Sequence, residues 1–166
     1  MKYSLSLLLI SCLCLSLAGC SKSATLKELL GIETVQYQES FNYDDLSAYS
    51  EGYTFTVLDL TAETVQAFQA NENKATLPKI KSGWQVSHWQ ATPAAEASVA
   101  ITEMATNYYS KNKTLEAHQQ ALLSVLNTPG NYYAYHSKSS GGAVYQALLY
   151  VVDAANNKIY LADCAF

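Results

Sequence analysis

Three histidines are the side chains best suited to acid–base chemistry in this chain of 166 residues. His88, His118 and His136 lie far apart, and no fixed spacing relates them to one another. An imidazole changes its charge near neutral pH, so His88 or His136 could act as the general base of a small hydrolase. However, His118 falls on the apolar stripe of a predicted helix and the other two fall in predicted strands. A core histidine with satisfied hydrogen bonds is the commoner occupant of such positions, and we expect no metal ligand among the three.

Other combinations of reactive side chains give weak signals. Ser110 and Lys113 have the SxxK spacing of penicillin-interacting serine enzymes, but the later KTG element is absent because Leu115 follows Lys113-Thr114. Glu96 and Glu103 are seven residues apart on one predicted helix, which is typical of a solvated face. The sequence contains no HExxH, GxxxxGK, GxGxxG or GxSxG pattern. We therefore assign no catalytic residue and expect no cofactor.

Tyrosine is the unusual component of the composition. The chain has 13 tyrosines, with clusters at Tyr108-Tyr109 and at Tyr132-Tyr133-x-Tyr135. A tyrosine offers a large contact area, few rotatable bonds and a polar tip, which suits a recognition surface. Aromatic residues are also favoured in strands for packing reasons alone, so both interpretations stay open.

The amino-terminal twenty residues have the pattern of a secretory signal. Met1-Lys2-Tyr3 is a short basic start, an apolar run extends from Leu5 to Leu17, and small residues follow. The apolar run is too short for a membrane-spanning helix. The tetrad Leu17-Ala18-Gly19-Cys20 resembles the lipobox of bacterial lipoproteins. The alternative is an ordinary cleaved signal in which Cys20 is a plain thiol.

The lipobox resemblance implies a lipid anchor. In that family a peptidase cuts before the cysteine, which is acylated on its sulfur and often on its new amino group. Each buried methylene contributes about 0.8 kcal/mol, so one chain binds marginally while two or three chains hold firmly. Ser21 follows Cys20, and by similarity to enterobacterial lipoproteins a residue other than Asp there implies transport to the outer membrane, facing the periplasm.

Cysteine content and charge restrict the mature protein further. Cys12 and Cys14 leave with the signal and Cys20 is acylated, so Cys164 is the one remaining thiol and no internal disulfide can form. We expect Cys164 to be a buried core residue. Loss of Lys2 leaves 9 lysines against 14 acids, a net charge of 9 − 14 = −5, and there is no arginine. This balance argues against a phosphate-reading nucleic-acid binder.

We divide the chain into a signal peptide at 1–19, a lipid-anchored tether and linker at 20–50, and a single α+β domain at 51–166. A short helix is possible at 24–30, and residues 35–41 alternate weakly as a strand would. Within the domain, periodicity and turn residues predict strands and helices in the order β-α-β-α-α-β-β-β. The expected elements are a strand at 53–60, a helix capped by Thr61, a strand at 83–90, a helix starting at Thr92-Pro93 with a stripe to Tyr108, a helix capped by Thr114, and strands at 131–138, 143–153 and 158–165.

The three carboxy-terminal strands are expected to form a meander whose turns set the register. Ser140-Gly141 or Gly141-Gly142 makes the first turn and Asn156-Asn157 the second. With the first choice, Tyr135 pairs with Gln146 and Tyr150 with Asp163. A core face then contains Ala134, His136, Tyr145, Ala147, Leu149, Ala162 and Cys164. The opposite, amphipathic face contains Tyr133, Tyr135, Gln146, Leu148, Tyr150, Leu161 and Asp163.

The expected fold is α+β, with an antiparallel sheet of about five strands and an antiparallel helix pair packed on one face. We interpret the protein as an envelope-anchored lipoprotein that binds a protein or glycan without catalysis, as an inhibitor, immunity protein or accessory subunit. The membrane, through acyl chains on Cys20, is its other partner. The expected partner-binding residues are Tyr133, Tyr135, Gln146, Tyr150 and Asp163. A histidine-based envelope hydrolase and a structural envelope lipoprotein remain the alternatives.

Overall fold

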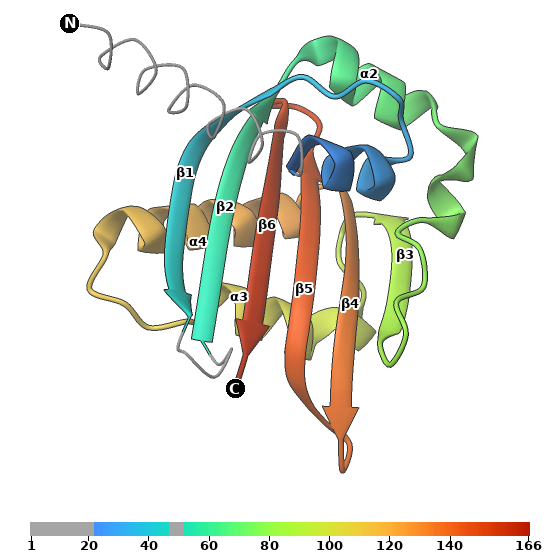
Figure 1. The fold of residues 1–166 in the computed structure, drawn as a ribbon. Coiled ribbons are helices and arrows are strands. Elements are labelled where there is room, and N and C mark those ends of the chain that lie inside the picture. Colours follow the sequence, from blue (N-terminus) through green and yellow to red (C-terminus); the bar gives the residue numbers. More distant parts are fainter. Residues whose placement is uncertain (1–21, 47–51) are drawn as a thin grey trace, which may run out of the picture.

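The computed structural model describes residues 22–46 and 52–166, which form an α+β fold (Figure 1). The sheet is antiparallel and six-stranded, with the order β1-β2-β6-β5-β4-β3. Its strands are β1 (Tyr37–Leu46), β2 (Gly52–Leu60), β3 (Gln85–Ala91), β4 (Tyr132–Ser140), β5 (Ala143–Asp153) and β6 (Lys158–Ala165). The helices are residues 22–30, α2 (Ala62–Ala70), α3 (Val99–Thr106) and α4 (Lys113–Asn127), with short 3-10 turns η1 (Glu72–Thr76) and η2 (Glu96–Ser98). No helix in the described part of the chain is both long and apolar enough to cross a membrane.

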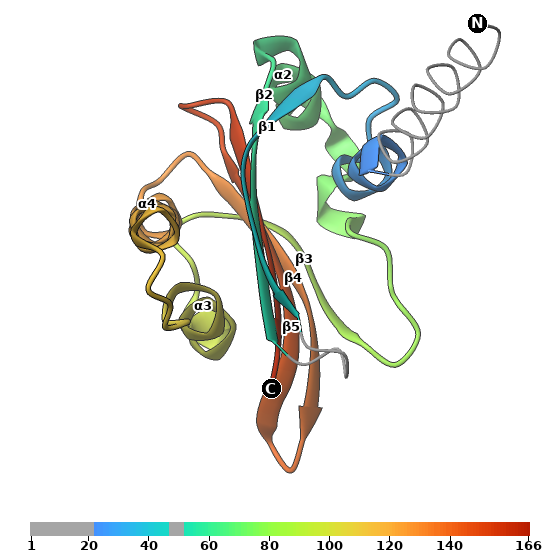
Figure 2. The same ribbon diagram turned by 60° about the vertical axis from the view of Figure 1, so that its left-hand side comes forward.

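Helices cover both faces of the sheet. Figure 2 shows α3 and α4 on one face and α2 with helix 22–30 on the other. The first face, which we call the α3–α4 face, packs the cluster Tyr53, Phe55, Val57, Ile101, Ala105, Leu115, Leu122, Val125, Leu126, Tyr133, Ala147, Leu149, Val151, Tyr160, Ala162 and Cys164. The second, the N-helix face, packs the cluster Leu26, Leu29, Leu30, Val35, Leu58, Leu60, Val65, Phe68, Leu77, Trp89, Ala134, Val152 and Ile159. The protein therefore has two cores, one on each side of a single sheet.

The helix starts follow from capping chemistry. Thr61 caps α2 as predicted, since its hydroxyl accepts a hydrogen bond from the Thr64 amide at 3.3 Å. The α4 cap is Asn112, whose side chain accepts from two backbone amides, so the helix includes the predicted cap Thr114. Thr92 does not begin a helix, because its hydroxyl donates to the Thr128 carbonyl at 2.5 Å. The α3 helix starts only at Val99.

Residues 22–46 are part of the folded domain, which corrects the tether expected at 20–50. Leu26, Leu29 and Leu30 are 1%, 6% and 0% exposed in the core of the N-helix face. The indole of Trp89 donates to the Leu29 carbonyl at 2.9 Å and fastens the helix to β3. β1 pairs with β2 along its length and adds the sixth strand to the expected five. The apolar side chains at i, i+3 and i+4 were visible in the sequence, but nothing local indicated what they pack against.

The register of the first hairpin differs from the expected one, and this corrects the face assignments of all the β4 residues. Tyr135 pairs with Leu149 and Tyr133 with Val151, because the turn lies at Gly141-Gly142 and a bulge falls between Lys138 and Ser139. The shift is an odd number of residues, so it moves every side chain of β4 to the opposite face. Tyr133 therefore joins the α3–α4 core, while Ala134 and His136 lie on the N-helix face.

The second hairpin keeps the expected faces although its pairing is also shifted. Tyr150 pairs with Leu161 in place of Asp163, a shift of two residues that leaves side-chain directions unchanged. The turn uses Asn157 at φ 52°, a conformation that Asn tolerates. Among the expected core residues, those placed correctly are Ala147, Leu149, Ala162 and Cys164. Tyr145, also expected in the core, is 43% exposed.

Candidate functional site

The five residues expected to bind a partner do not form one surface. Gln146, Tyr150 and Asp163 share the N-helix face, whereas Tyr133 and Tyr135 belong to the α3–α4 face. Tyr133 is 1% exposed, and its hydroxyl donates to Gln90 Oε1 at 2.8 Å while accepting from the Ala95 amide at 2.9 Å. It is a core residue and cannot reach a partner. Whether the first three residues bind one stays a prediction.

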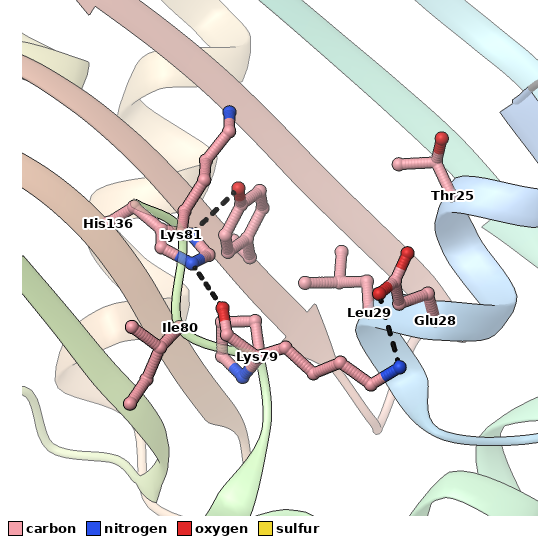
Figure 3. A pocket seen from close by; sticks show the side chains of 9 residues that line it. Thr25, Glu28, Leu29, Lys79, Ile80, Lys81 and His136 are labelled. Atoms are coloured by element: carbon pink, nitrogen blue, oxygen red, sulfur yellow. Dashed lines mark hydrogen bonds and ion pairs between the residues drawn. The ribbon is translucent and has the colours of Figure 1, made fainter. Parts of the chain in front are cut away.

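Because of the register shift, His136 lies on the N-helix face, where Tyr133 and Tyr135 were expected. Its side chain is buried on the N-helix face beside Tyr150 (Figure 3). Nε2 lies 2.9 Å from the Lys79 carbonyl oxygen and Nδ1 lies 3.2 Å from the Tyr150 hydroxyl. A carbonyl oxygen can only accept, so Nε2 donates to it, and in the neutral imidazole Nδ1 then accepts from the tyrosine. Both ring nitrogens are engaged in holding the fold together.

A pocket of about 220 Å³ opens beside this histidine. It lies between helix 22–30, the segment 78–81 and the side chains of β4 and β5 (Figure 3). The residues that line it are Thr25, Glu28, Leu29, Pro78, Lys79, Ile80, Lys81, His136 and Tyr150. Segments distant in the sequence thus build one hollow, whose wall is mostly apolar with charged groups at its rim.

Lys79 and Lys81 line the pocket, and the indole of Trp84 and the ammonium group of Lys138 lie next to Lys81 and His136. Lys79 Nζ lies 3.3 Å from Glu28 Oε1, and both side chains are largely exposed. The ammonium groups of Lys81 and Lys138 lie 4.8 Å and 4.5 Å from the centroid of the Trp84 ring. That ring in turn meets His136 edge to face at 6.3 Å. Such cation–aromatic contacts fix the positions of ammonium groups that remain accessible to a ligand.

Asp163 lies in the same cross-strand row as His136, with Leu148 between them. Two strand spacings separate the two backbones by about 10 Å. The Asp163 Oδ1 atom is buried and has no hydrogen-bond partner within residues 22–46 and 52–166. Burial raises the pKa of Asp163, and the nearby Lys81 charge opposes that rise. Burial, followed by the Asp163 charge, raises the pKa of Tyr150, so its hydroxyl stays protonated.

The other two histidines lie elsewhere and do not join a reactive cluster. Nδ1 of His88 is 3.2 Å from the Pro78 carbonyl oxygen. The His118 ring packs on Phe41 at 4.4 Å, and burial, with a smaller effect of the Lys158 charge, lowers its pKa. Across the described ranges, no three or more His, Cys, Asp or Glu side chains are grouped in a way that could hold a metal ion.

The remaining reactive residues have structural partners. Ser110 Oγ lies 3.1 Å from the Tyr43 hydroxyl, while Lys113 donates to Glu116 at 2.7 Å, so the SxxK pair is not assembled. Cys164 is 0% exposed, as expected, and burial raises its pKa to about 12. Its thiol therefore stays protonated and unreactive.

The Tyr108-Tyr109 cluster lines part of a second hollow, which lies at the start of α4. Tyr108 stacks on Tyr53 at 4.4 Å and donates its hydroxyl to Asp45 Oδ2 at 2.5 Å. That hydrogen bond is the main reason why the pKa of Tyr108 rises to about 12. Tyr109 next to it is 85% exposed. Tyr108 is thus a structural residue, and the hollow of about 370 Å³ beside it has a mixed polar and apolar lining.

Sequence reasoning missed the contribution of helix 22–30 and of the segment 78–81 to this site. Glu28, Lys79 and His136 are brought together because helix 22–30 and the segment 78–81 pack on the same face of the sheet, which no local pattern encodes. The one sequence signal was the alternation Lys79-Ile80-Lys81, an apolar residue between two cations. No protein-family model, curated protein or solved structure matches this chain.

Proposed function

We propose that the protein is a lipoprotein of the bacterial envelope, anchored through Cys20, that recognises a protein or glycan partner without catalysis. Its binding site is the part of the N-helix face formed by Gln146, Tyr150, Asp163 and the pocket beside His136. The outer membrane, facing the periplasm, is the proposed location, and the lipobox with Ser21 is what supports it.

The observation that favours binding is that the buried Asp163 Oδ1 has no hydrogen-bond partner in the part of the chain that the structure describes. A buried acceptor without a hydrogen bond costs about 1–3 kcal/mol, so a native fold keeps few of them. A donor supplied by a partner would recover that cost. Tyr150 lines the pocket, and its hydroxyl oxygen, whose proton is donated to His136, can accept a hydrogen bond from the same ligand.

Hydrolysis is the weaker proposal. A general base needs a free lone pair within reach of the nucleophile, and the Nδ1 of His136 already accepts from Tyr150. In the described structure no carboxylate is hydrogen-bonded to His136, so nothing orients it as a base.

The proposed site can be tested by photo-crosslinking from within the face. A photoreactive amino acid replaces Gln146 in the acylated protein in intact cells, and Tyr109 on the other side of the molecule serves as the matched control position. The expected result is a partner crosslinked from position 146 and absent from position 109. The partner is then purified, and Asp163→Asn is expected to weaken its binding roughly 10-fold or more, as for loss of a charged hydrogen bond. Equal crosslinking from both positions, or equal affinity of the variant, contradicts the proposal.

A further inference from the structure

The fold begins almost at the proposed anchor. Lys22, two residues after Cys20, is already in a helix whose leucines are buried, and it pairs with Glu39 of β1. Two residues of extended chain reach at most about 7 Å. Acyl chains on Cys20 would therefore bring the start of helix 22–30 to the lipid headgroups.

We propose that helix 22–30 and the loop 78–84 form the bilayer-facing surface of the domain, with Lys79, Ile80 and Lys81 contacting anionic phospholipid. This inference rests on the acylation of Cys20 in the proposed function. It adds an orientation and a lipid specificity that acylation alone does not imply.

Charge distinguishes this surface from the rest of the protein. Helix 22–30 and loop 78–84 contain Lys22, Lys27, Lys79 and Lys81 against one acid, Glu28, which gives 4 − 1 = +3. The mature chain has 9 lysines and 14 acids, so all other residues together amount to −5 − 3 = −8. Lys27 and Lys81 form no ion pair with another described residue. An acidic protein thus presents free cations next to its anchor, where an anionic leaflet attracts lysine.

Ile80 gives the same surface an apolar point of contact. Its side chain is 77% exposed and points away from helix 22–30 (Figure 3). The flanking amines of Lys79 and Lys81 can bind phosphate groups while the isoleucine enters the boundary between headgroups and acyl chains. An exposed isoleucine between two lysines is less suited to a water-facing loop, where it would bury no surface.

The test places a nitroxide spin label at position 80 of the acylated full chain, through Ile80→Cys, in vesicles of phosphatidylethanolamine and phosphatidylglycerol. Tyr109→Cys is the matched control, because Tyr109 is also highly exposed but adjoins α4 on the α3–α4 face. Cys164 is buried and stays unlabelled. Collision of the label with a water-soluble nickel chelate is expected to fall at least threefold at position 80 on vesicle binding and to stay unchanged at position 109.

Two further arms identify the cause. Replacing the anionic lipid by phosphatidylcholine, or introducing Lys79→Gln with Lys81→Gln, is expected to restore at least half of the chelate collisions. Equal chelate access at positions 80 and 109 on anionic vesicles overturns the inference, as does protection that appears only after a protein partner is added. Mass spectrometry of Cys20 separates the two proposals. Absence of acyl groups rejects the anchor, whereas an acylated protein with an exposed label rejects the orientation alone.

Discussion

Asp163 combines a cost to stability with the proposed role in binding. Its pKa is raised above the ordinary 3.8 because burial disfavours the carboxylate. The folded state then holds the proton more tightly than the unfolded state. The contribution of protonated Asp163 to the free energy of unfolding is fully present below pH 3.8 and is lost as the pH rises through the folded-state pKa. Above that folded-state pKa the ionised group therefore weakens the fold.

Asp163→Asn is expected to raise the free energy of unfolding at pH 7 by about 1 kcal/mol and to remove the corresponding fall in stability above pH 3.8. Urea unfolding at a series of pH values measures it. Asp59→Asn is the opposite control, because a hydrogen bond from Lys158 lowers the pKa of Asp59. The contribution of ionised Asp59 to the free energy of unfolding is present above the unfolded-state pKa and is lost as the pH falls through the folded-state pKa. A destabilised Asp163→Asn at pH 7 would contradict this account.

Tyr133 is expected to matter for folding and not for recognition. Tyr133→Phe leaves the Ala95 amide and the Gln90 side chain without their partner, which should lower the unfolding free energy by about 1–2 kcal/mol. Tyr133→Ala also opens a cavity and should cost about 3–5 kcal/mol. Tyr135→Phe, on the same face of the same strand but only half-buried, is the control. Denaturant unfolding that ranks Tyr135→Phe as more harmful than Tyr133→Phe would reverse the assignment.

At the scale of elements, helix 22–30 is the part whose role the structure changes most. Its three leucines are enclosed and its carbonyl at Leu29 holds the indole of Trp89. A tether would tolerate shortening or substitution, whereas a helix in the core would not. Substitutions in the helix, followed by measurement of the free energy of unfolding, therefore distinguish the two roles.

Leu26→Ala is expected to lower the unfolding free energy by about 2–5 kcal/mol, because Leu26 is 1% exposed and its removal leaves a cavity. Lys27→Ala on the exposed side of the same helix should change it by less than about 0.5 kcal/mol. Both are measured by chemical denaturation of the mature chain. Similar values for the two variants would mean that the helix contributes little to the fold.

The sequence predicts elements better than it predicts their pairing. The strand at 53–60 and the helix capped by Thr61 follow from local chemistry, and both are confirmed. β1 was too weakly patterned to be recognised as a full strand, since seven of its ten residues are exposed. The face of Tyr133 depended on a bulge between Lys138 and Ser139, and a bulge has no reliable local signal. The candidate site was also without a local signal, because long-range packing assembles Glu28, Lys79 and His136.

At the scale of the whole molecule, Figure 2 shows α2 and helix 22–30 over the upper part of the N-helix face, which leaves the rest of that face less covered. The proposed partner site and the proposed bilayer-facing surface both lie on this side. Recognition would then occur close to the membrane, beside the loop 78–84.

Cys20→Ser is expected to move the protein from the membrane fraction to the soluble periplasmic fraction, because the lysine-rich surface alone lacks the affinity of two or three acyl chains. Carbonate extraction followed by immunoblotting measures this, with Cys164→Ser as the control that keeps the anchor. Retention of Cys20→Ser after extraction would show that another element holds the protein.

The short distance between Cys20 and the first buried helix also limits how far the protein can reach. A body built from a chain of this length is roughly 40 Å across. If the protein is anchored through Cys20 as proposed, this short connection lets it rotate about the anchor and diffuse laterally, but does not let it extend to the opposite layer of the envelope. A partner of the anchored protein would then have to come within about one molecular diameter of the same leaflet, and the proposed encounter would be a two-dimensional search at high local concentration.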